Sequence, residues 1–312
     1  MTLLRPRVGE WTEEQTRALL AAARSAPTRS HEHPWLIELR GHGAFVYERL
    51  SMRRRYPAGR DRLLSCGAVV ANLHTTICAL GWEPELLTGP CREPDLIAVV
   101  RAGRRHVATG AALARREAIA HVDRSDRVPL LSPVDGQTGR WLADADWCPR
   151  TEAKLLADPK TAAVLGELVL HAARRWDGDR RIANELAAWL GATPMTDDHC
   201  VVPYERAVSA IAARIAAERV LVVLTPDDGR TDQMMAGAAV QAIRLTATMS
   251  ELAAVPVTAL LRIPELRSGL IDAAQLPGFP QALVRIGRVP VPVRQARQGT
   301  HRGIRPLPVD WW

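Results

Sequence analysis

Two short segments carry side chains suited to binding an anionic ligand. The first, AIAHVDRSDRVPL (118–130), contains Arg124, Ser125 and Arg127. A planar guanidinium can donate two parallel hydrogen bonds to phosphate oxygens, and a serine hydroxyl supplies a further donor. The second, ARSAPTRSHEHPW (23–35), is a proline-bearing loop segment between a helical and a β-rich pattern. These segments predict a site for a small phosphorylated ligand.

The other polar residues do not indicate a metal site or a disulfide framework. The cysteines are odd in number and none forms a CxxC pair: Cys66, Cys78, Cys91, Cys148 and Cys200. His199 adjoins Cys200, but adjacent side chains rarely converge on one ion and no partner pair is evident. We therefore expect no metal, and a reducing cytoplasm is the simplest location. The N-terminus lacks an apolar signal region, and the apolar stretches are too interrupted to span a membrane.

The net charge of +7 raises the alternative of a nucleic-acid binder. The arginines are spread along the chain among carboxylates, and only 4% of the residues are Phe, Trp or Tyr that could stack on bases. A solvated basic surface with a few arginines that bind a small ligand is the simpler interpretation, so we expect neither nucleic acid nor membrane as a partner.

An internal repeat organises the chain. SCGAVVANLHTTICALG (65–81) aligns without a gap on MAGAAVQAIRLTATMSE (235–251), and Gly67 lies opposite Gly237. Both segments are apolar on nearly all sides, as in a helix at the centre of a large core, and their small residues would let another helix approach closely. A chance likeness between two apolar helices is the alternative.

The flanking elements repeat in the same order, which favours duplication over chance. Each core helix is preceded by a β-rich run and followed by another, and an amphipathic helix lies ahead of each unit: 34–39 and 219–225, 96–104 and 282–288, 13–26 and 161–176. A duplicated α+β unit would build a pseudo-two-fold molecule, the covalent version of a C2 homodimer.

The two ligand-binding segments resemble motifs of nitroreductase-family flavoproteins. Residues 23–35 resemble APSxxNxQPW, a loop that borders the flavin, and 118–130 resemble RRSxR, which grips the FMN phosphate. In that family the motifs come from opposite subunits, whereas here each half of one chain supplies one. The resemblance covers nearly the whole chain and points to the internally fused, Acg-like branch of the family.

The resemblance implies an α+β, nitroreductase-like three-layer fold in which two tandem half-repeats form a single-chain pseudo-dimer. We expect one half at 1–115, a second at 116–290 and a C-terminal arm at 291–312. Residues 189–207 are either a lid over the site or an inert surface loop. The chain would be a monomer or a weak homodimer.

The same resemblance assigns the cofactor residues. Arg124, Ser125 and Arg127 would hold the FMN phosphate, and two arginines of the tail would close its pocket. The remaining positions would border the flavin or its ribityl chain. The full set is Pro27, Thr28, Arg29, His31, Arg124, Ser125, Arg127, Val255, Pro256, Arg294 and Arg297.

Several departures from the family motifs affect these assignments. Asp123 stands where the first arginine of RRSxR is expected, which places an anion close to the phosphate. His31 and His33 replace an amide pair, so these loop histidines either donate to the flavin ring or are simply exposed. The first half has no RRSxR ahead of its opening helix, and RWDGDRRIANELAAW (175–189) stands where a second APSxxNxQPW would belong. One composite FMN site is therefore expected, without its pseudo-symmetric mate.

Three functions follow as hypotheses. The leading one is an FMN-dependent reductase in which NAD(P)H supplies the electrons and a nitro, quinone or similar compound accepts them. The second is a flavin-sequestering stress or dormancy protein whose lid blocks turnover. The third is the basic nucleic-acid binder. No catalytic side chain is assigned, because the redox chemistry belongs to the flavin.

Overall fold

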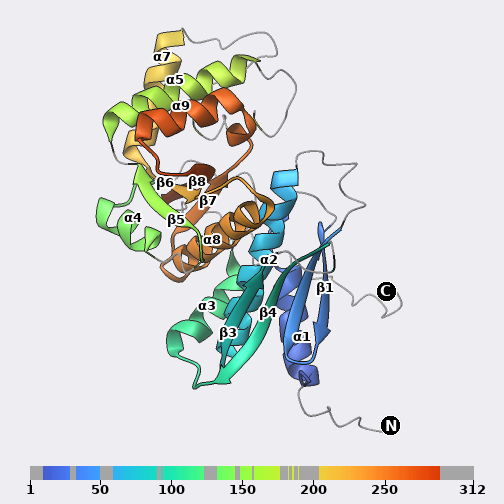
Figure 1. Cartoon of the computed structure of the whole chain (residues 1–312). Helices are drawn as coiled ribbons and strands as arrows, with labels where there is room; N and C mark the ends of the chain where they lie inside the picture. The colour runs from blue at the N-terminus through green and yellow to red at the C-terminus, as the bar shows by residue number, and fades with distance from the viewer. Residues whose placement is uncertain are drawn as a thin grey trace, which may run out of the picture.

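Two four-stranded sheets form the framework of the protein (Figure 1). The computed structural model describes residues 10–28, 33–49, 59–89, 93, 95–122, 132–144, 148–156, 158–175, 182, 185, 189 and 204–288. The first sheet and its helices comprise α1 (Glu13–Arg24), β1 (Trp35–Arg40), β2 (Gly43–Glu48), α2 (Gly59–Ala79), β3 (Trp82–Thr88), β4 (Leu96–Arg105) and α3 (Gly110–His121). The second comprises α4 (Gly136–Ala143), β5 (Glu152–Leu156), α5 (Pro159–Arg175), α7 (Tyr204–Ala217), β6 (Arg219–Thr225), α8 (Arg230–Met249), β7 (Ala253–Val257), η2 (Leu260–Arg262), α9 (Pro264–Ala274) and β8 (Phe279–Gly287).

Both sheets have the same strand order. The first runs β1-β2-β4-β3 and the second β5-β6-β8-β7, with every neighbouring pair antiparallel. In each sheet a long helix, α2 or α8, connects the second strand to an edge strand. The predicted α+β class is confirmed, as is the predicted order of strand, helix and strand around each core helix.

The two core helices form a layer between the sheets. Helix α2 packs on β2, β3 and β4, helix α8 packs on β6, β7 and β8, and the two helices pack on each other. Side chains alternate across β6, so that Leu221 and Val223 face the central layer while Val220 and Val222 face away from it. That outer face is covered by α5, α7 and α9 (Figure 1).

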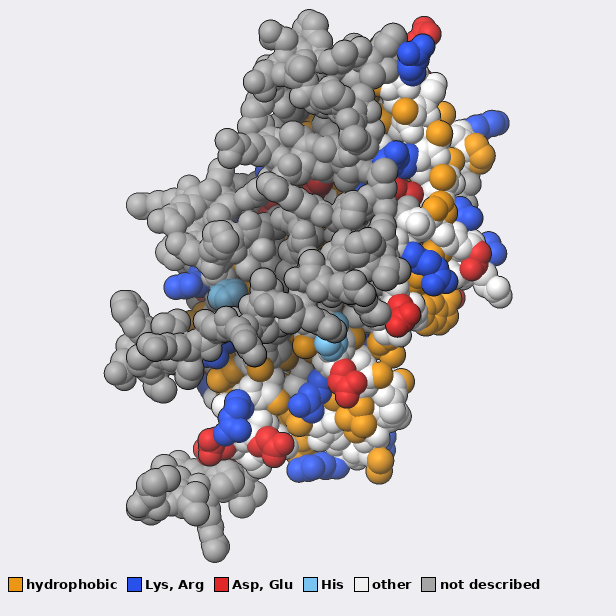
Figure 2. All heavy atoms as spheres, turned by 180° about the vertical axis from the view of Figure 1, so that it is seen from behind, with side chains coloured by type: hydrophobic (Ala, Val, Ile, Leu, Met, Phe, Trp, Pro, Cys, Tyr) orange, Lys and Arg blue, Asp and Glu red, His pale blue; other side chains and the backbone are white. Residues whose placement is uncertain are grey.

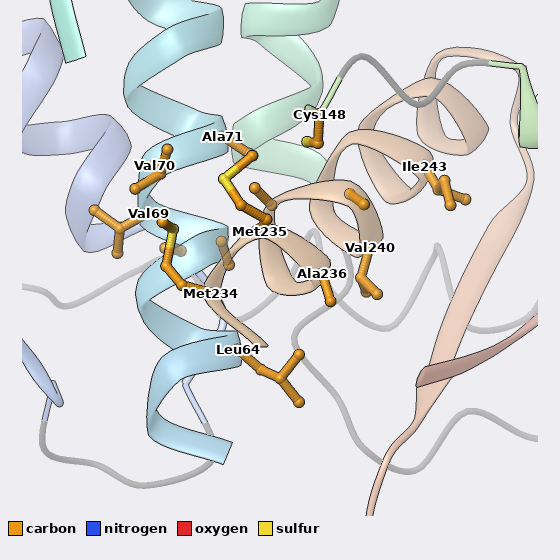
Figure 3. Close-up of a cluster of buried hydrophobic side chains, with 14 of the residues drawn as sticks. Leu64, Val69, Val70, Ala71, Cys148, Met234, Met235, Ala236, Val240 and Ile243 are labelled. Atoms are coloured by element: carbon orange, nitrogen blue, oxygen red, sulfur yellow. The ribbon is translucent and has the colours of Figure 1, made fainter. Parts of the chain in front are cut away.

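Helices α2 and α8 cross at Gly67 and Gly237. A Cβ added to Gly67 would lie 1.8 Å from the Met234 carbonyl oxygen, and one added to Gly237 would lie 2.0 Å from that of Leu64. The close approach expected from the small residues is therefore confirmed, and the approaching partner is the equivalent helix. The contacts are reciprocal, as in the interface of a C2 dimer. Figure 3 shows Leu64 and Met234 among the apolar side chains that surround this crossing.

Side-chain caps define where several helices begin. Thr12 and Gln15 form a capping box at the start of α1, in which each side chain bonds the other residue's backbone N–H. Thr109 caps α3, and Asp135 caps α4 through the Thr138 N–H at 2.7 Å. These contacts satisfy backbone donors that have no partner inside the helix.

The strand order corrects two of the sequence-based correspondences. We paired 34–39 with 219–225, but β1 corresponds in sheet order to β5, and β6 corresponds to β2. Similarly, the opening helix α1 corresponds to α4, because each precedes the first strand of its sheet. Helices α5 and α7 belong to an insertion between β5 and β6, where the first half has only a tight turn between β1 and β2. An amphipathic pattern reports an apolar face but does not reveal what covers it, which is why α5 resembled α1.

The strand order also changes which segment of the second half corresponds to the APSxxNxQPW loop. The sequence placed it at 175–189, which lies in the insertion. By strand order it is the connection between α4 and β5, at residues 144–151. There Arg150 has a positive φ of 63° and its guanidinium donates to Asp232 and Asp227. The loop therefore has a local structure of its own, fixed against the start of α8.

Among the described helices, not one combines the length and hydrophobicity that crossing a bilayer requires.

Candidate functional site

The described part of the chain contains four of the eleven predicted site residues. Pro27 and Thr28 follow the end of α1 and are half-buried, and Val255 and Pro256 are half-buried in β7. The other seven lie outside the described residues: Arg29, His31, Arg124, Ser125, Arg127, Arg294 and Arg297. Most of the candidate lid at 189–207 and the whole arm at 291–312 also lie outside them.

A backbone bridge joins Ser132 to Arg288, two residues that adjoin the arginine-bearing segments in sequence. The Ser132 N–H donates to the Arg288 carbonyl at 3.1 Å, and the Arg288 N–H donates to the Ser132 carbonyl at 3.0 Å. Ser132 directly follows the segment that contains Arg124 and Arg127, and Arg288 directly precedes the one that contains Arg294.

The predicted phosphate-binding segment, which contains Arg124 and Arg127, follows Val122 in sequence, and Val122 lies beside α1. Val122, at the end of α3, shares a small apolar cluster with Ala118 and Ile119 of α3, Ala22 of α1 and Leu245 of α8. The Ala22 carbonyl also accepts a hydrogen bond from Asn72 of α2 at 2.9 Å, and Asn72 in turn accepts one from Gln241 of α8 at 3.0 Å. The helix that leads to Pro27 and the helix that leads to Asp123 are thus joined across the two halves.

The far end of the predicted flavin loop is fixed against α2. The Pro34 carbonyl accepts from the Arg49 N–H at 3.0 Å, and the Cys66 Sγ lies 3.8 Å from the same oxygen. Cys66 is fully buried, and burial together with the negative charge of Glu48 raises the pKa of its thiol. A thiol in this environment stays protonated and is no nucleophile at neutral pH.

An ion cluster that the sequence did not predict lies at the start of the core helices, with Glu48 and Arg62 buried and Arg230 half exposed. Glu48 accepts from Arg62 Nε at 2.9 Å and from Arg230 Nη2 at 2.6 Å. Burial alone would raise the pKa of Glu48, but the hydrogen bonds and charges of the two arginines outweigh it and lower that pKa. Since Glu48 and Arg62 belong to the first half and Arg230 to the second, this cluster couples the halves.

Arg60 of α2 makes a second set of polar contacts between the halves. Its Nε donates to Gln281 Oε1 at 3.1 Å, its Nη2 donates to the Gln281 carbonyl, and its Nη1 donates to the Thr258 carbonyl at 3.3 Å. One sequence signal could have found these residues. The gapless repeat extends back to Gly59-Arg60 and Gly229-Arg230, so an arginine of each core helix reaches into the opposite half.

A surface pocket adjoins the Ser132–Arg288 bridge. It has a volume of about 410 Å³ and is lined by Pro133, Val134, Asp135, Thr138, Trp141, Ser250, Leu252 and Arg288. Arg288 is exposed there and supplies the cation of the lining, and the Trp141 side chain is also exposed. Elsewhere charge is mixed: on the face shown in Figure 2, acidic side chains lie among the Lys and Arg side chains of the described surface.

The fold defines an α+β protein in which two sheets of identical strand order enclose a pair of crossed helices. No family model matches the chain. It is 28% identical over 303 residues to an uncharacterized Mycobacterium tuberculosis protein, covering 88% of this chain and 86% of that relative. Two M. tuberculosis proteins named as putative NAD(P)H nitroreductases, one of them acg, are each 24% identical, over 299 and 307 residues. These alignments cover 89% of this chain and 86% and 90% of the relatives.

Two solved structures show a more distant likeness. The FMN-bound nitroreductase of Bacteroides fragilis is 12% identical with a TM-score of 0.40, covering 63% of this chain and 95% of its own. The FMN-dependent nitroreductase NfnB of Mycobacterium smegmatis, in complex with NADPH, is 16% identical with a TM-score of 0.40, covering 57% and 89%. These relatives support the predicted family: over most of its length the chain is similar to Acg-like proteins named as putative NAD(P)H nitroreductases.

Proposed function

We propose that this protein binds one FMN between its two halves and uses NAD(P)H to reduce nitro, quinone or similar acceptors. The observation that supports the proposal is the Ser132–Arg288 bridge, which joins the residue after one arginine-bearing segment to the residue before the other. The named relatives support the reductase activity, since they are named as putative NAD(P)H nitroreductases.

The donor set suits the FMN phosphate. Arg124, Ser125 and Arg127 from one side of the bridge, with Arg294 and Arg297 from the other, would provide guanidinium and hydroxyl donors to its oxygens. Pro27 and Thr28 would border the flavin from the first half, and Val255 and Pro256 from the second. FMN, when bound, supplies the hydride and one-electron chemistry. The chain's own residues bind and orient it.

The proposal includes an internal duplication with residues 1–115 and 116–290 as the two halves, and a single cofactor site per chain. In the other half the equivalent loop carries Arg150, whose guanidinium lies 3.0 Å from Asp232 and 3.0 Å from Asp227. That guanidinium is already paired, and no RRSxR segment lies ahead of the opening helix of the first half, which supports one site rather than two.

A visible spectrum and the flavin content of the freshly purified protein test the cofactor. We expect a yellow protein that releases one FMN per chain. Mixing it anaerobically with NADPH should bleach the flavin absorbance, and a nitroaromatic should restore it. A colourless protein that does not take up added FMN would contradict the proposal.

The flavin-sequestering alternative makes a different prediction for the same experiment. A protein of this class would hold FMN, but NADPH would leave the flavin oxidised because the reductant is excluded. The altered flavin loop, in which His31 and His33 replace an amide pair, motivates this second candidate. Bleaching by NADPH within seconds decides for the reductase.

A further inference from the structure

The turn that follows β7 is held by a carboxylate from a distant segment. The N–H groups of Thr258 and Ala259 donate to Glu185 Oε1, both at 3.0 Å, and the N–H of Leu260 donates to Glu185 Oε2 at 3.0 Å. All three turn residues are buried. A carboxylate is well suited to this position, because its two oxygens can accept several hydrogen bonds and donate none.

Glu185 lies in sequence between two buried apolar residues. Ile182, Glu185 and Trp189 are helical, and their spacing puts them on one side of a helix. The Ile182 and Trp189 side chains are buried in the apolar cluster beneath α5, α7 and α9. This helical segment belongs to the insertion between β5 and β6, so the carboxylate ties that insertion to the turn.

The opposite side of the turn is held by the first half of the protein. The Thr258 carbonyl accepts from Arg60 Nη1 at 3.3 Å, and Arg60 also bonds the buried Gln281 of β8. The turn therefore has its carbonyl fixed by α2 and its N–H groups fixed by the insertion. It continues directly from Val255 and Pro256, the β7 residues of the proposed cofactor site.

We propose that Glu185 is a positioning residue of the cofactor site. It fixes the backbone after β7 at the geometry that the site requires, and it couples the insertion to that site. The inference rests on the proposed function, because it assigns the turn to the surroundings of FMN. The carboxylate acts through the turn backbone rather than by touching a substrate.

Amide hydrogen exchange tests the clamp without reference to any cofactor. Glu185→Ala should accelerate exchange at Thr258, Ala259 and Leu260 by about tenfold or more, the change expected when a charge-assisted hydrogen bond is lost. Glu185→Gln should give a smaller increase, since its amide keeps one acceptor oxygen. Glu167→Gln is the matched control, because Glu167 is exposed on α5 in the same insertion. Unchanged exchange at all three amides in Glu185→Ala would overturn the clamp.

Titration of the full-length variants with FMN tests the positioning role. Glu185→Ala should weaken FMN binding by about tenfold or more and alter the absorbance band of the bound flavin, with partial recovery in Glu185→Gln. Wild-type affinity and spectrum in a folded Glu185→Ala protein would overturn the positioning role alone. A wild-type protein that binds no FMN would overturn the proposed function and the positioning role with it. The exchange measurement needs no cofactor, so it still tests the hydrogen bonds of Glu185 in that case.

Discussion

Gly67 and Gly237 meet backbone to backbone where α2 and α8 cross, and each occupies the position in its helix that the other occupies in the repeat. The proposed duplication would therefore place its pseudo-two-fold axis close to this contact. The two halves are joined here without any side chain between the helices, so even a methyl group has no room.

Replacing either glycine with alanine should destabilise the protein. A Cβ at Gly67 would meet the Met234 carbonyl, and backbone cannot move aside as a flexible side chain can. We expect Gly67→Ala and Gly237→Ala each to lower the free energy of unfolding by about 2–3 kcal/mol, measured by urea denaturation. Gly110→Ala is the control, since no atom lies within 4 Å of its added Cβ. Equal stability of all three variants would contradict the backbone contact.

The ion cluster around Glu48 should be far more sensitive than an exposed pair. Glu48→Gln leaves Arg62 and Arg230 without their carboxylate, and we expect a loss of about 3 kcal/mol or more in unfolding free energy. Glu13→Gln removes the exposed pair with Arg17 and should cost less than about 1 kcal/mol. Thermal and urea unfolding of both variants provide the comparison. A loss below about 1 kcal/mol for Glu48→Gln would mean that the cluster does not join the halves.

Stability should fall in mildly acidic solution because of His74. Burial, with a smaller contribution from the Arg115 charge, lowers the pKa of His74 from 6.5 to about 4. Between these values the unfolded chain binds a proton that the folded protein excludes. The folded state therefore loses up to about 1.4 kcal/mol per pH unit as the pH falls from 6.5 to about 4, and no more below that.

His74→Gln isolates this effect, since the variant has no group to titrate at that position. The difference between wild type and variant in unfolding free energy should be constant above pH 6.5 and should shift in favour of the variant toward pH 4. Parallel pH profiles for the two proteins would show that His74 is protonated as readily in the folded state as in the unfolded chain.

The proposed phosphate residues should control FMN affinity. Arg124→Ala combined with Arg127→Ala should weaken FMN binding by about 100-fold or more, because hydrogen bonds to charged groups contribute about 1.5–3 kcal/mol each. Arg104→Ala is the control, since its guanidinium is exposed at the end of β4. Isothermal titration with FMN gives the affinities. An unchanged affinity in the double variant would move the cofactor site elsewhere.

The sequence alone was sufficient to predict the two core helices, their glycines and the α+β class. These features could be recognised because a helix buried on all sides is apolar on all sides, and because Gly67 and Gly237 recur at the same place in two copies. The resemblance to the family motifs also depends on residue types at short spacing, and the site residues that it assigns stay a prediction.

Only the tertiary structure decided which elements correspond and which charges are buried. The pairing of β1 with β2 and of β5 with β6 identified α5 as part of an insertion, because hydrogen bonds between strands distant in sequence leave no local pattern. Arg60 lies among charged residues in sequence and Glu48 stands at the end of a strand, so neither position is marked as buried by its local pattern. Their burial arises from the meeting of two halves more than a hundred residues apart. Local composition carries no trace of such a contact, because it depends on the packing of α2 against α8.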